Sequence, residues 1–399
     1  MTRTKVYSSA LDKSIEVDRI IGLIKGASPG PTLIFMSGIH GNEPAGVFAL
    51  KRVLSQLEKV KIKGNFYAVA GNLSALNQGI RFHKEDLNRV WTKERMKRLG
   101  DEEDRANQDI EEQIQINALI QKILRTEKGP FYFFDMHTTS SETPPFLTVN
   151  DSLLNRNFTA QYPLPTILGI EEYLEGPILS YMNELGYVAF GFEAGQHDEM
   201  GSIENCVSFI FLSMIYAGTL RKDQVDYYKY RDSLAKYTRE KKYIFEIIYR
   251  YLIEEGEEFS MEPGFYNFQK IKVNQHLANS NGKPIKATDD GRIFMPLYQP
   301  QGLDGYFTIR QIWKPLLRLS AFIRKYRLDR MLVFLPGVKW LDKKKSGLMV
   351  NKQIARFMAK DLFHLFGYRS VSIDQNHLKM FNREASSRFS EYSGAKWLN

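Results

Sequence analysis

The chain has 399 residues, of which 43% are hydrophobic and 25% charged. These values fit a globular protein with one large domain and one or two smaller ones. The N-terminus leads into no apolar stretch of the signal-peptide type, and no uninterrupted apolar run reaches the length of a membrane span, about 18 residues. Cys206 is the only cysteine, which excludes an intramolecular disulfide and favours a reducing, cytoplasmic location.

The net charge of +9 is concentrated at one end of the chain. Residues 311–399 carry +12, and the rest of the chain carries −3. A basic region can contact nucleic acid or an anionic membrane, or it can be the solvated face of an accessory domain. Since nothing in this region matches a nucleic-acid-binding motif, we favour the solvated face and expect no nucleic-acid partner.

The first elements surround a short turn that carries a histidine and a carboxylate. Residues 5–27 predict an edge strand with a hairpin, and the apolar run 32–36 predicts a buried strand that breaks at a glycine. The spacing of apolar residues then predicts a helix over 44–57, with Pro44 at its first position. His40 and Glu43 therefore lie in a tight strand-to-helix turn at the edge of a sheet.

A strand at 65–70 is followed by a long loop that contains Arg81 and the run Asp86-Leu87-Asn88-Arg89. A loop of this length inside a compact domain is usually functional. The alternative is a loop held together by pairs between its arginines and Asp86. A strongly periodic helix with an acidic first turn is predicted over 102–125.

Two further apolar strands end in polar residues. The first, 131–137, ends in Asp135-Met136-His137, and the second, 187–193, ends in Glu193. Strands that alternate with helices predict an α/β fold with a mixed, mostly parallel sheet flanked by helices. In such sheets, ligands bind outside the carboxyl ends of the strands, which is where these side chains lie.

The sequence predicts three domains. Residues 1–223, which end in a buried helix over 202–220, form the first and largest. Residues 224–315 read as a connecting segment followed by short strands and turns, which predicts a small β domain in the form of a partly open barrel. Residues 316–399 form a basic α/β or helical region.

His40, Glu43 and His137 are candidate metal ligands. Two histidines and one glutamate, with a fourth position left open for water, are a common catalytic zinc set. An HxxE pair also arises by chance, and a histidine at a strand end is often a core residue. Asp135 would fix the ring of His137, or it could equally cap the strand.

Four motifs occur in an order that resembles a known family. They are HGNE at 40–43, R-x4-DLNR at 81–89, DMHTT at 135–139 and FEAG at 192–195. Together they are similar to the succinylglutamate desuccinylase/aspartoacylase family, a branch of the zinc carboxypeptidase-like superfamily. Residues 294–307 also resemble the small C-terminal domain of bacterial members. The resemblance covers roughly residues 15–315.

The resemblance implies roles for several residues. Glu193 would act as general base and acid, and Arg81 would polarise the scissile carbonyl. Asn88 and Arg89 would hold the carboxylate of the amino-acid product, for which the planar guanidinium is well suited. Glu193 could instead form a salt bridge at its strand end.

A tyrosine from the C-terminal domain is a further substrate-binding candidate by resemblance to aspartoacylases. Tyr306 or Tyr298 would supply it, although a packed tyrosine of the β domain is the alternative.

We therefore expect a zinc-dependent amidohydrolase with one Zn²⁺ per chain, which deacylates an N-acyl amino acid. A carboxypeptidase-like hydrolase of short peptides, or a binding protein that uses its basic tail, are the alternatives, and a homo-oligomer stays open. Residues 138–192 contain Arg156 as their only cation, and Asn183 stands where the resemblance to aspartoacylases implies an arginine that helps to hold a charged substrate. An unpaired buried charge is costly, so we expect a substrate with a single carboxylate.

Overall fold

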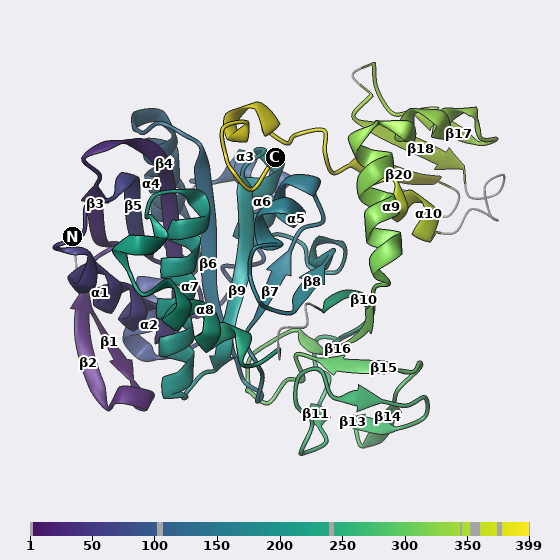
Figure 1. Cartoon of the computed structure of the whole chain (residues 1–399). Coiled ribbons are helices and arrows are strands. Elements are labelled where there is room, and N and C mark those ends of the chain that lie inside the picture. The colour runs from purple at the N-terminus through teal and green to yellow at the C-terminus, as the bar shows by residue number, and fades with distance from the viewer. Residues whose placement is uncertain are drawn as a thin grey trace.

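The computed structural model describes residues 3–101, 107–238, 243–343, 345–351, 360–372 and 377–398. An 11-stranded sheet runs through most of the molecule (Figure 1), in the order β12-β15-β16-β10-β8-β7-β9-β6-β4-β5-β3. Its strands are β3 (Ile20–Lys25), β4 (Ser28–Ser37), β5 (Lys63–Ala70), β6 (Phe131–Thr139), β7 (Phe146–Val149), β8 (Thr166–Leu168), β9 (Val188–Gln196), β10 (Ile244–Leu252), β12 (Lys270–Ile271), β15 (Gly291–Phe294) and β16 (Asp304–Gln311).

The middle of the sheet is parallel. β4 pairs with β5 and β6, and β6 pairs with β9. Near-continuous apolar strands such as 33–36 are buried on both faces, as parallel strands require. Because these strands run in one direction, their carboxyl ends meet at one edge. The register sets His137 directly opposite Glu193.

Helices cover both faces of this sheet, which confirms the expected α/β fold. Phe35 packs with α1 and α7 on one face, whereas Ile34 and Met36 pack with α4 and α6 on the other. Pro44 caps α1 instead of occupying its first position. The helices of this part are α1 (Ala45–Leu57), α2 (Leu73–Gln78), α3 (Lys93–Arg98), α4 (Gln108–Thr126), α5 (Leu153–Thr159), α6 (Ile178–Glu184), α7 (Met200–Ala217) and α8 (Tyr227–Ala235).

The acidic residues 102–104, expected in the first turn of α4, lie outside the described residues; the observed first turn carries Asp109 and Glu111. Among the described helices, α7 alone is long and apolar enough to cross a membrane by composition. Within the molecule, 78% of it is buried, because it packs against α1, α8 and the sheet. It therefore behaves as the core helix that the sequence predicts.

The sheet continues past residue 223, where the sequence predicts a domain boundary. β10 pairs in parallel with β8 and antiparallel with β16, so the second segment extends the central sheet. A separate three-stranded sheet of β11 (Phe259–Met261), β13 (His276–Ser280) and β14 (Lys283–Lys286) packs beside it. The sequence predicts short strands in residues 224–315, but it does not indicate which neighbouring strands they pair with.

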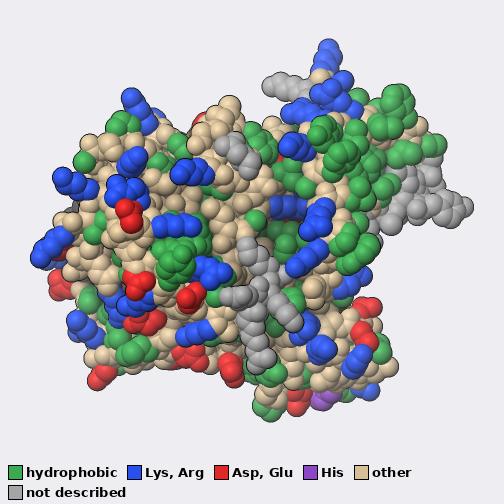
Figure 2. All heavy atoms as spheres, viewed as in Figure 1, with side chains coloured by type: hydrophobic (Ala, Val, Ile, Leu, Met, Phe, Trp, Pro, Cys, Tyr) green, Lys and Arg blue, Asp and Glu red, His purple; other side chains and the backbone are tan. Residues whose placement is uncertain are grey.

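The C-terminal module combines helices with an antiparallel sheet in the order β17-β18-β20-β19. Its basic side chains lie among hydrophobic ones in Figure 2. Residues 352–359 of this region lie outside the described residues. The elements are α9 (Lys314–Lys325), β17 (Val338–Trp340), β18 (Gly347–Asn351), α10 (Lys360–Leu365), β19 (Tyr368–Ser372) and β20 (His377–Asn382).

Both ends of the chain pack against the first domain. The expected N-terminal hairpin is formed by β1 (Thr4–Ser8) and β2 (Lys13–Val17). At the other end, the residues after β20 return from the C-terminal module to the central sheet (Figure 1), where Tyr392 and Trp397 pack against the ring of Tyr132.

Candidate metal and active site

The site lies at the carboxyl ends of β4, β6 and β9. After β4 the chain turns at Gly38, whose φ of +76° suits glycine. Gly41 lies so close to the backbone of α2 that a Cβ there would come within 2.1 Å of the Ala75 carbonyl carbon. The HGNE turn therefore needs its glycine for close packing, and this packing presents His40 and Glu43 to the sheet edge.

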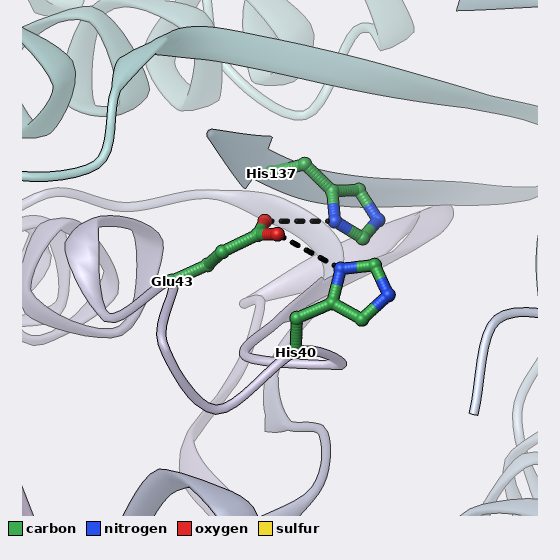
Figure 3. Close-up of side chains that lie close together, drawn as sticks. All are labelled: His40, Glu43 and His137. Carbon is green, nitrogen blue, oxygen red and sulfur yellow. Dashed lines mark hydrogen bonds and ion pairs between the residues drawn. The ribbon is translucent and has the colours of Figure 1, made fainter. Parts of the chain in front are cut away.

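His40, Glu43 and His137 converge on one point (Figure 3). The Glu43 carboxylate lies 2.8 Å from Nδ1 of His40 and 3.0 Å from Nδ1 of His137. The three donor atoms all lie within 4.8 Å of one another, and all three side chains are buried. This set of two nitrogens and one oxygen is a candidate site for a zinc ion.

A second carboxylate lies behind each histidine. Asp135 Oδ2 is 2.6 Å from Nε2 of His137, and Asp86 Oδ1 is 2.9 Å from Nε2 of His40. A carboxylate at the far ring nitrogen fixes the ring and leaves the other nitrogen free for a metal. From the sequence, this contact is one of two roles predicted for Asp135. For Asp86 the sequence indicates only ion pairs with the arginines, and the contact with His40 is seen only in the structure.

The charges of the cluster are strongly coupled. Burial disfavours ionisation of Glu43, but the imidazolium charges of His40 and His137 outweigh this effect and hold the pKa of Glu43 well below its usual range. For His137, burial acts against protonation, but Asp135 and Glu43 raise its pKa well above the ordinary value. The site therefore favours the ionised carboxylate that a metal ligand needs.

Glu193 is buried next to this cluster, but its hydrogen bonding and its pKa differ from those of Glu43. Its Oε2 has no hydrogen-bond partner among the described residues. Burial is the main cause that raises the pKa of Glu193 to about 8, although the nearby charge of His137 opposes it. A buried carboxyl group with a free oxygen can hold a proton and release it near neutral pH.

Arg81, Asn88 and Arg89 all line the cavity in front of the cluster. Arg81 donates to Glu43 at 3.4 Å and to Asp86 at 3.2 Å. The side-chain oxygen of Asn88 accepts from the backbone N–H of Ile178 at 3.1 Å. These contacts hold the expected clamp residues in place beside the candidate metal ligands.

Arg89 has an acidic partner that the sequence argument did not identify. Its Nη2 donates to Asp304 at 3.0 Å, and Asp304 also accepts from Arg250 Nε at 2.6 Å. Asp304 lies at the start of β16, 215 residues from Arg89 along the chain. Only the three-dimensional pairing brings them together.

The cavity has a volume of about 140 Å³. Its lining includes the apolar side chains of Ile170, Leu174 and Leu179 and the neutral polar groups of Thr148, Asn150 and Ser180, all from the first domain. Among the described lining residues, Arg81 and Arg89 are the only lysine or arginine side chains. Arg156 lies elsewhere, paired with Asp151.

The structure does not bring either tyrosine candidate to the cavity. Tyr306 is 1% exposed and stacks on Tyr251 in the β-domain core, with the ring centroids 5.6 Å apart. The Tyr298 hydroxyl donates to the Glu262 carbonyl at 2.7 Å. The stretch 294–307, which contains both tyrosines, instead contributes Gln299 and Asp304 to the cavity lining. In the sequence, only their polar side chains within a stretch rich in proline and glycine could have indicated that these two residues line the cavity.

His197, which received no role from the sequence, lies beside the site. Thr138 Oγ1 is 2.7 Å from its Nδ1, and Gln299 Oε1 is 3.3 Å from its Nε2. Burial lowers the pKa of His197. Since the backbone N–H of Thr138 donates to Glu43 at 3.0 Å, His197 helps to fix the backbone around a candidate ligand.

Comparisons with known proteins agree with this geometry. Residues 29–202 match the profile of the succinylglutamate desuccinylase/aspartoacylase catalytic domain. The succinylglutamate desuccinylase of Photorhabdus laumondii is 34% identical over 74 residues, which are 18% of this chain and 23% of that protein. The matched segments thus span less than two thirds of such relatives, from 23% to 31% of their length.

Solved structures are similar over a larger part of the chain. A succinylglutamate desuccinylase from Vibrio cholerae has a TM-score of 0.53 at 15% identity, over 78% of this chain and 91% of that chain. A succinylglutamate desuccinylase/aspartoacylase from Rhodobacter sphaeroides has a TM-score of 0.53 at 15% identity, over 78% and 95%. At this level of identity the similarity shows a shared fold.

Proposed function

We propose that this chain, whose residues 29–202 match the succinylglutamate desuccinylase/aspartoacylase catalytic domain, is a zinc-dependent amidohydrolase that removes the acyl group from an N-acyl amino acid. One observation carries the proposal. Two histidine Nδ1 atoms and the Glu43 carboxylate face a common point, beside the buried Glu193 with its unpartnered oxygen.

The donor set fits zinc. Each histidine turns Nδ1 toward the common point while a carboxylate holds its Nε2, as is usual for histidine ligands of zinc. A zinc ion bound by His40, Glu43 and His137 would supply Lewis acidity, which polarises a carbonyl and lowers the pKa of water to about 7.

The protein side chains perform the proton transfers in this proposal. Oε2 of Glu193 accepts a proton from the water that adds to the amide carbon. When the carbon–nitrogen bond breaks, Glu193 returns that proton to the departing amine, and the products are a carboxylic acid and an amino acid. The Arg81 guanidinium lies close enough to the cluster to stabilise the negative charge that develops on the carbonyl oxygen.

Charge in the cavity supports a substrate with one carboxylate. Arg89 and Asn88 are the proposed binding groups for that carboxylate. A second acidic group would need another cation, and none of the other described lining residues supplies one. The β-domain residue that contacts Arg89 through a hydrogen bond is the acidic Asp304. We therefore propose a neutral acyl group and a neutral or basic amino-acid side chain.

The cavity favours a small substrate over a peptide. Its volume is about 140 Å³, and Met295, Pro296, Leu297, Gln299 and Asp304 of the second segment contribute to its lining, so the enclosed space suits a small molecule better than a peptide. This observation places the carboxypeptidase-like reaction second. We also propose a cytoplasmic location, which agrees with a single, buried thiol at Cys206.

A substrate panel tests this function. The zinc-loaded protein is assayed with N-acetyl derivatives of neutral and basic amino acids, N-acetyl-aspartate, N-succinyl-glutamate and short peptides. We expect kcat/KM for the best monocarboxylate to exceed that of the acidic compounds by about tenfold or more, which corresponds to about 1.4 kcal/mol. Chelation of the metal should abolish turnover. A preference for the acidic compounds contradicts the charge argument, and turnover that survives chelation contradicts the metal.

A further inference from the structure

The outer side of α9 exposes a row of large apolar side chains. Leu316, Leu319, Phe322 and Tyr326 follow one another at spacings of three, three and four residues, which places them on one side of a helix. Phe322 is 55% exposed and Tyr326 61%, and Trp313 at the start of the helix is 73% exposed. We call these five residues the α9 ridge. Soluble surfaces rarely expose so many large apolar groups together.

The next segment enlarges the same apolar surface. The short 3-10 helix Leu328–Phe334 packs against α9, and it leaves Met331 62% and Phe334 84% exposed. The sequence predicts a solvated basic face here, and the structure shows large exposed apolar side chains beside the basic ones.

The opposite side of α9 is fixed to the rest of the molecule. Arg324 is buried and donates to Asp151 Oδ2 at 2.8 Å and to the His364 carbonyl at 2.7 Å. Ser320 donates to the Leu365 carbonyl at 2.8 Å. Because these contacts set the rotation of the helix, the ridge cannot turn inward without breaking a buried ion pair, which is costly.

Cations lie alongside the ridge. Lys314, Arg318 and Lys325 are spaced by four and seven residues, so they form a second row next to the apolar one, and within the described residues none of them forms an ion pair. Residues 313–351 contain ten lysines and arginines and only two acidic residues. Figure 2 shows hydrophobic and basic side chains interleaved over this helix.

We propose that the α9 ridge and its cationic row dock the protein onto an anionic phospholipid surface. A helix with tryptophan, phenylalanine and leucine on one side and basic residues beside them is suited to lie in the membrane interface. Lysine and arginine contact the headgroups while their carbon chains cover apolar surface.

Charge complementarity favours an anionic lipid surface over a second copy of the chain as the binding partner of the α9 ridge. A second copy of the chain would bring the same cationic row against itself, and like charges oppose such pairing. An anionic lipid surface satisfies both the cations and the apolar row at once. Since the ridge belongs to the C-terminal module and not to the cavity, this proposal is independent of the proposed reaction.

Vesicle binding tests the proposal with the full-length protein. The vesicles are phosphatidylcholine alone, or phosphatidylcholine with phosphatidylglycerol, and binding is followed by co-sedimentation and by tryptophan fluorescence. We expect binding only to the phosphatidylglycerol vesicles, with a blue shift that Trp313→Phe removes. Binding should weaken about tenfold or more when salt is raised from 0.1 M to 1 M, since the screening length falls from about 10 Å to about 3 Å.

Matched variants distinguish the contributions of the apolar and cationic rows to vesicle binding from non-specific effects of substitution. Leu319→Ser/Phe322→Ser and Arg318→Gln/Lys325→Gln should each weaken vesicle binding about tenfold or more. Leu252→Ser/Tyr228→Ser and Lys59→Gln/Lys61→Gln change comparable exposed residues elsewhere and should leave it unchanged. Thermal melting checks that each variant is folded.

Other outcomes contradict the proposal. If the wild-type protein ignores both kinds of vesicle but dissociates from dimer to monomer when Phe322 is changed, the ridge is an interface between copies. If it binds both vesicles equally, or if the control variants lose binding to the same extent, the α9 ridge is not the site. Salt-sensitive binding to nucleic acid without binding to vesicles also overturns it.

Discussion

Glu193 lies across the β6–β9 register from His137 and is the residue whose proposed role is most specific. Glu193→Gln keeps the shape of the side chain but cannot accept the proton. We expect kcat to fall by about 10² to 10⁴, with KM and metal content nearly unchanged. Steady-state kinetics and metal analysis measure both. Glu204→Gln, an exposed change on α7, is the control, and near-normal turnover of Glu193→Gln would remove Glu193 from the mechanism.

At the scale of residues, the sequence could predict what lies at strand ends but not what reaches across loops. His40, His137 and Glu193 converge because parallel strands share an edge, which follows from the apolar runs before them. The contact of Asp86 with His40 depends on how the 81–89 loop folds back, and the pair of Arg89 with Asp304 joins two distant segments. Spacing along the chain carries no information about either contact.

At the scale of elements, a buried ion cluster joins the C-terminal module to the wall of the cavity. Arg383, just after β20, donates to Glu171 at 2.8 Å and also pairs with Glu172 and with Asp151. Asn150 and Ile170, the neighbours of these acidic residues, line the cavity. Arg383→Met would leave buried carboxylates unpaired, so we expect a loss of about 3 to 5 kcal/mol in the free energy of unfolding, measured by denaturant titration.

The effect of Arg383→Met should depend on pH. Burial disfavours ionisation of Asp151, but three arginines outweigh it and hold its pKa well below the usual range. This contribution to stability is present above the unfolded pKa of aspartate, about 3.9, and is lost as the pH falls through the lower folded value. The wild-type advantage over the variant should be full near pH 7 and shrink below about pH 4. Arg388→Met, which removes a largely exposed pair with Glu391, is the control, and an advantage that stays constant down to low pH would contradict the account.

Periodicity predicted most elements but not their partners. The short strands predicted within residues 224–315 are present, yet only the structure shows that β10 joins the central sheet through β8. For α9, the same apolar residues that suggest burial lie on the exposed side, because the cluster around Arg324 decides which side of the helix faces inward.

At the scale of the whole molecule, the last residues tie the C-terminal module to the catalytic sheet. The Tyr392 hydroxyl donates to the Phe131 carbonyl and accepts from the backbone N–H of Val188. These contacts lie at the starts of β6 and β9, the strands that carry His137 and Glu193. From its net charge alone, the region 316–399 would be described as a separate basic tail. A truncation at Trp313 would uncover the core, so point variants are the better probes of the module.

The central claim is that His40, Glu43 and His137 hold one zinc ion, and the metal content of the purified full-length protein tests it most directly. Mass spectrometry of the wild type, His40→Ala, His137→Ala and the control Glu204→Gln gives the content per chain, and circular dichroism checks folding. We predict about one zinc per chain in the wild type and control, and a zinc content that is lower by about tenfold or more in both histidine variants. Folded histidine variants that retain wild-type zinc content would contradict the claim.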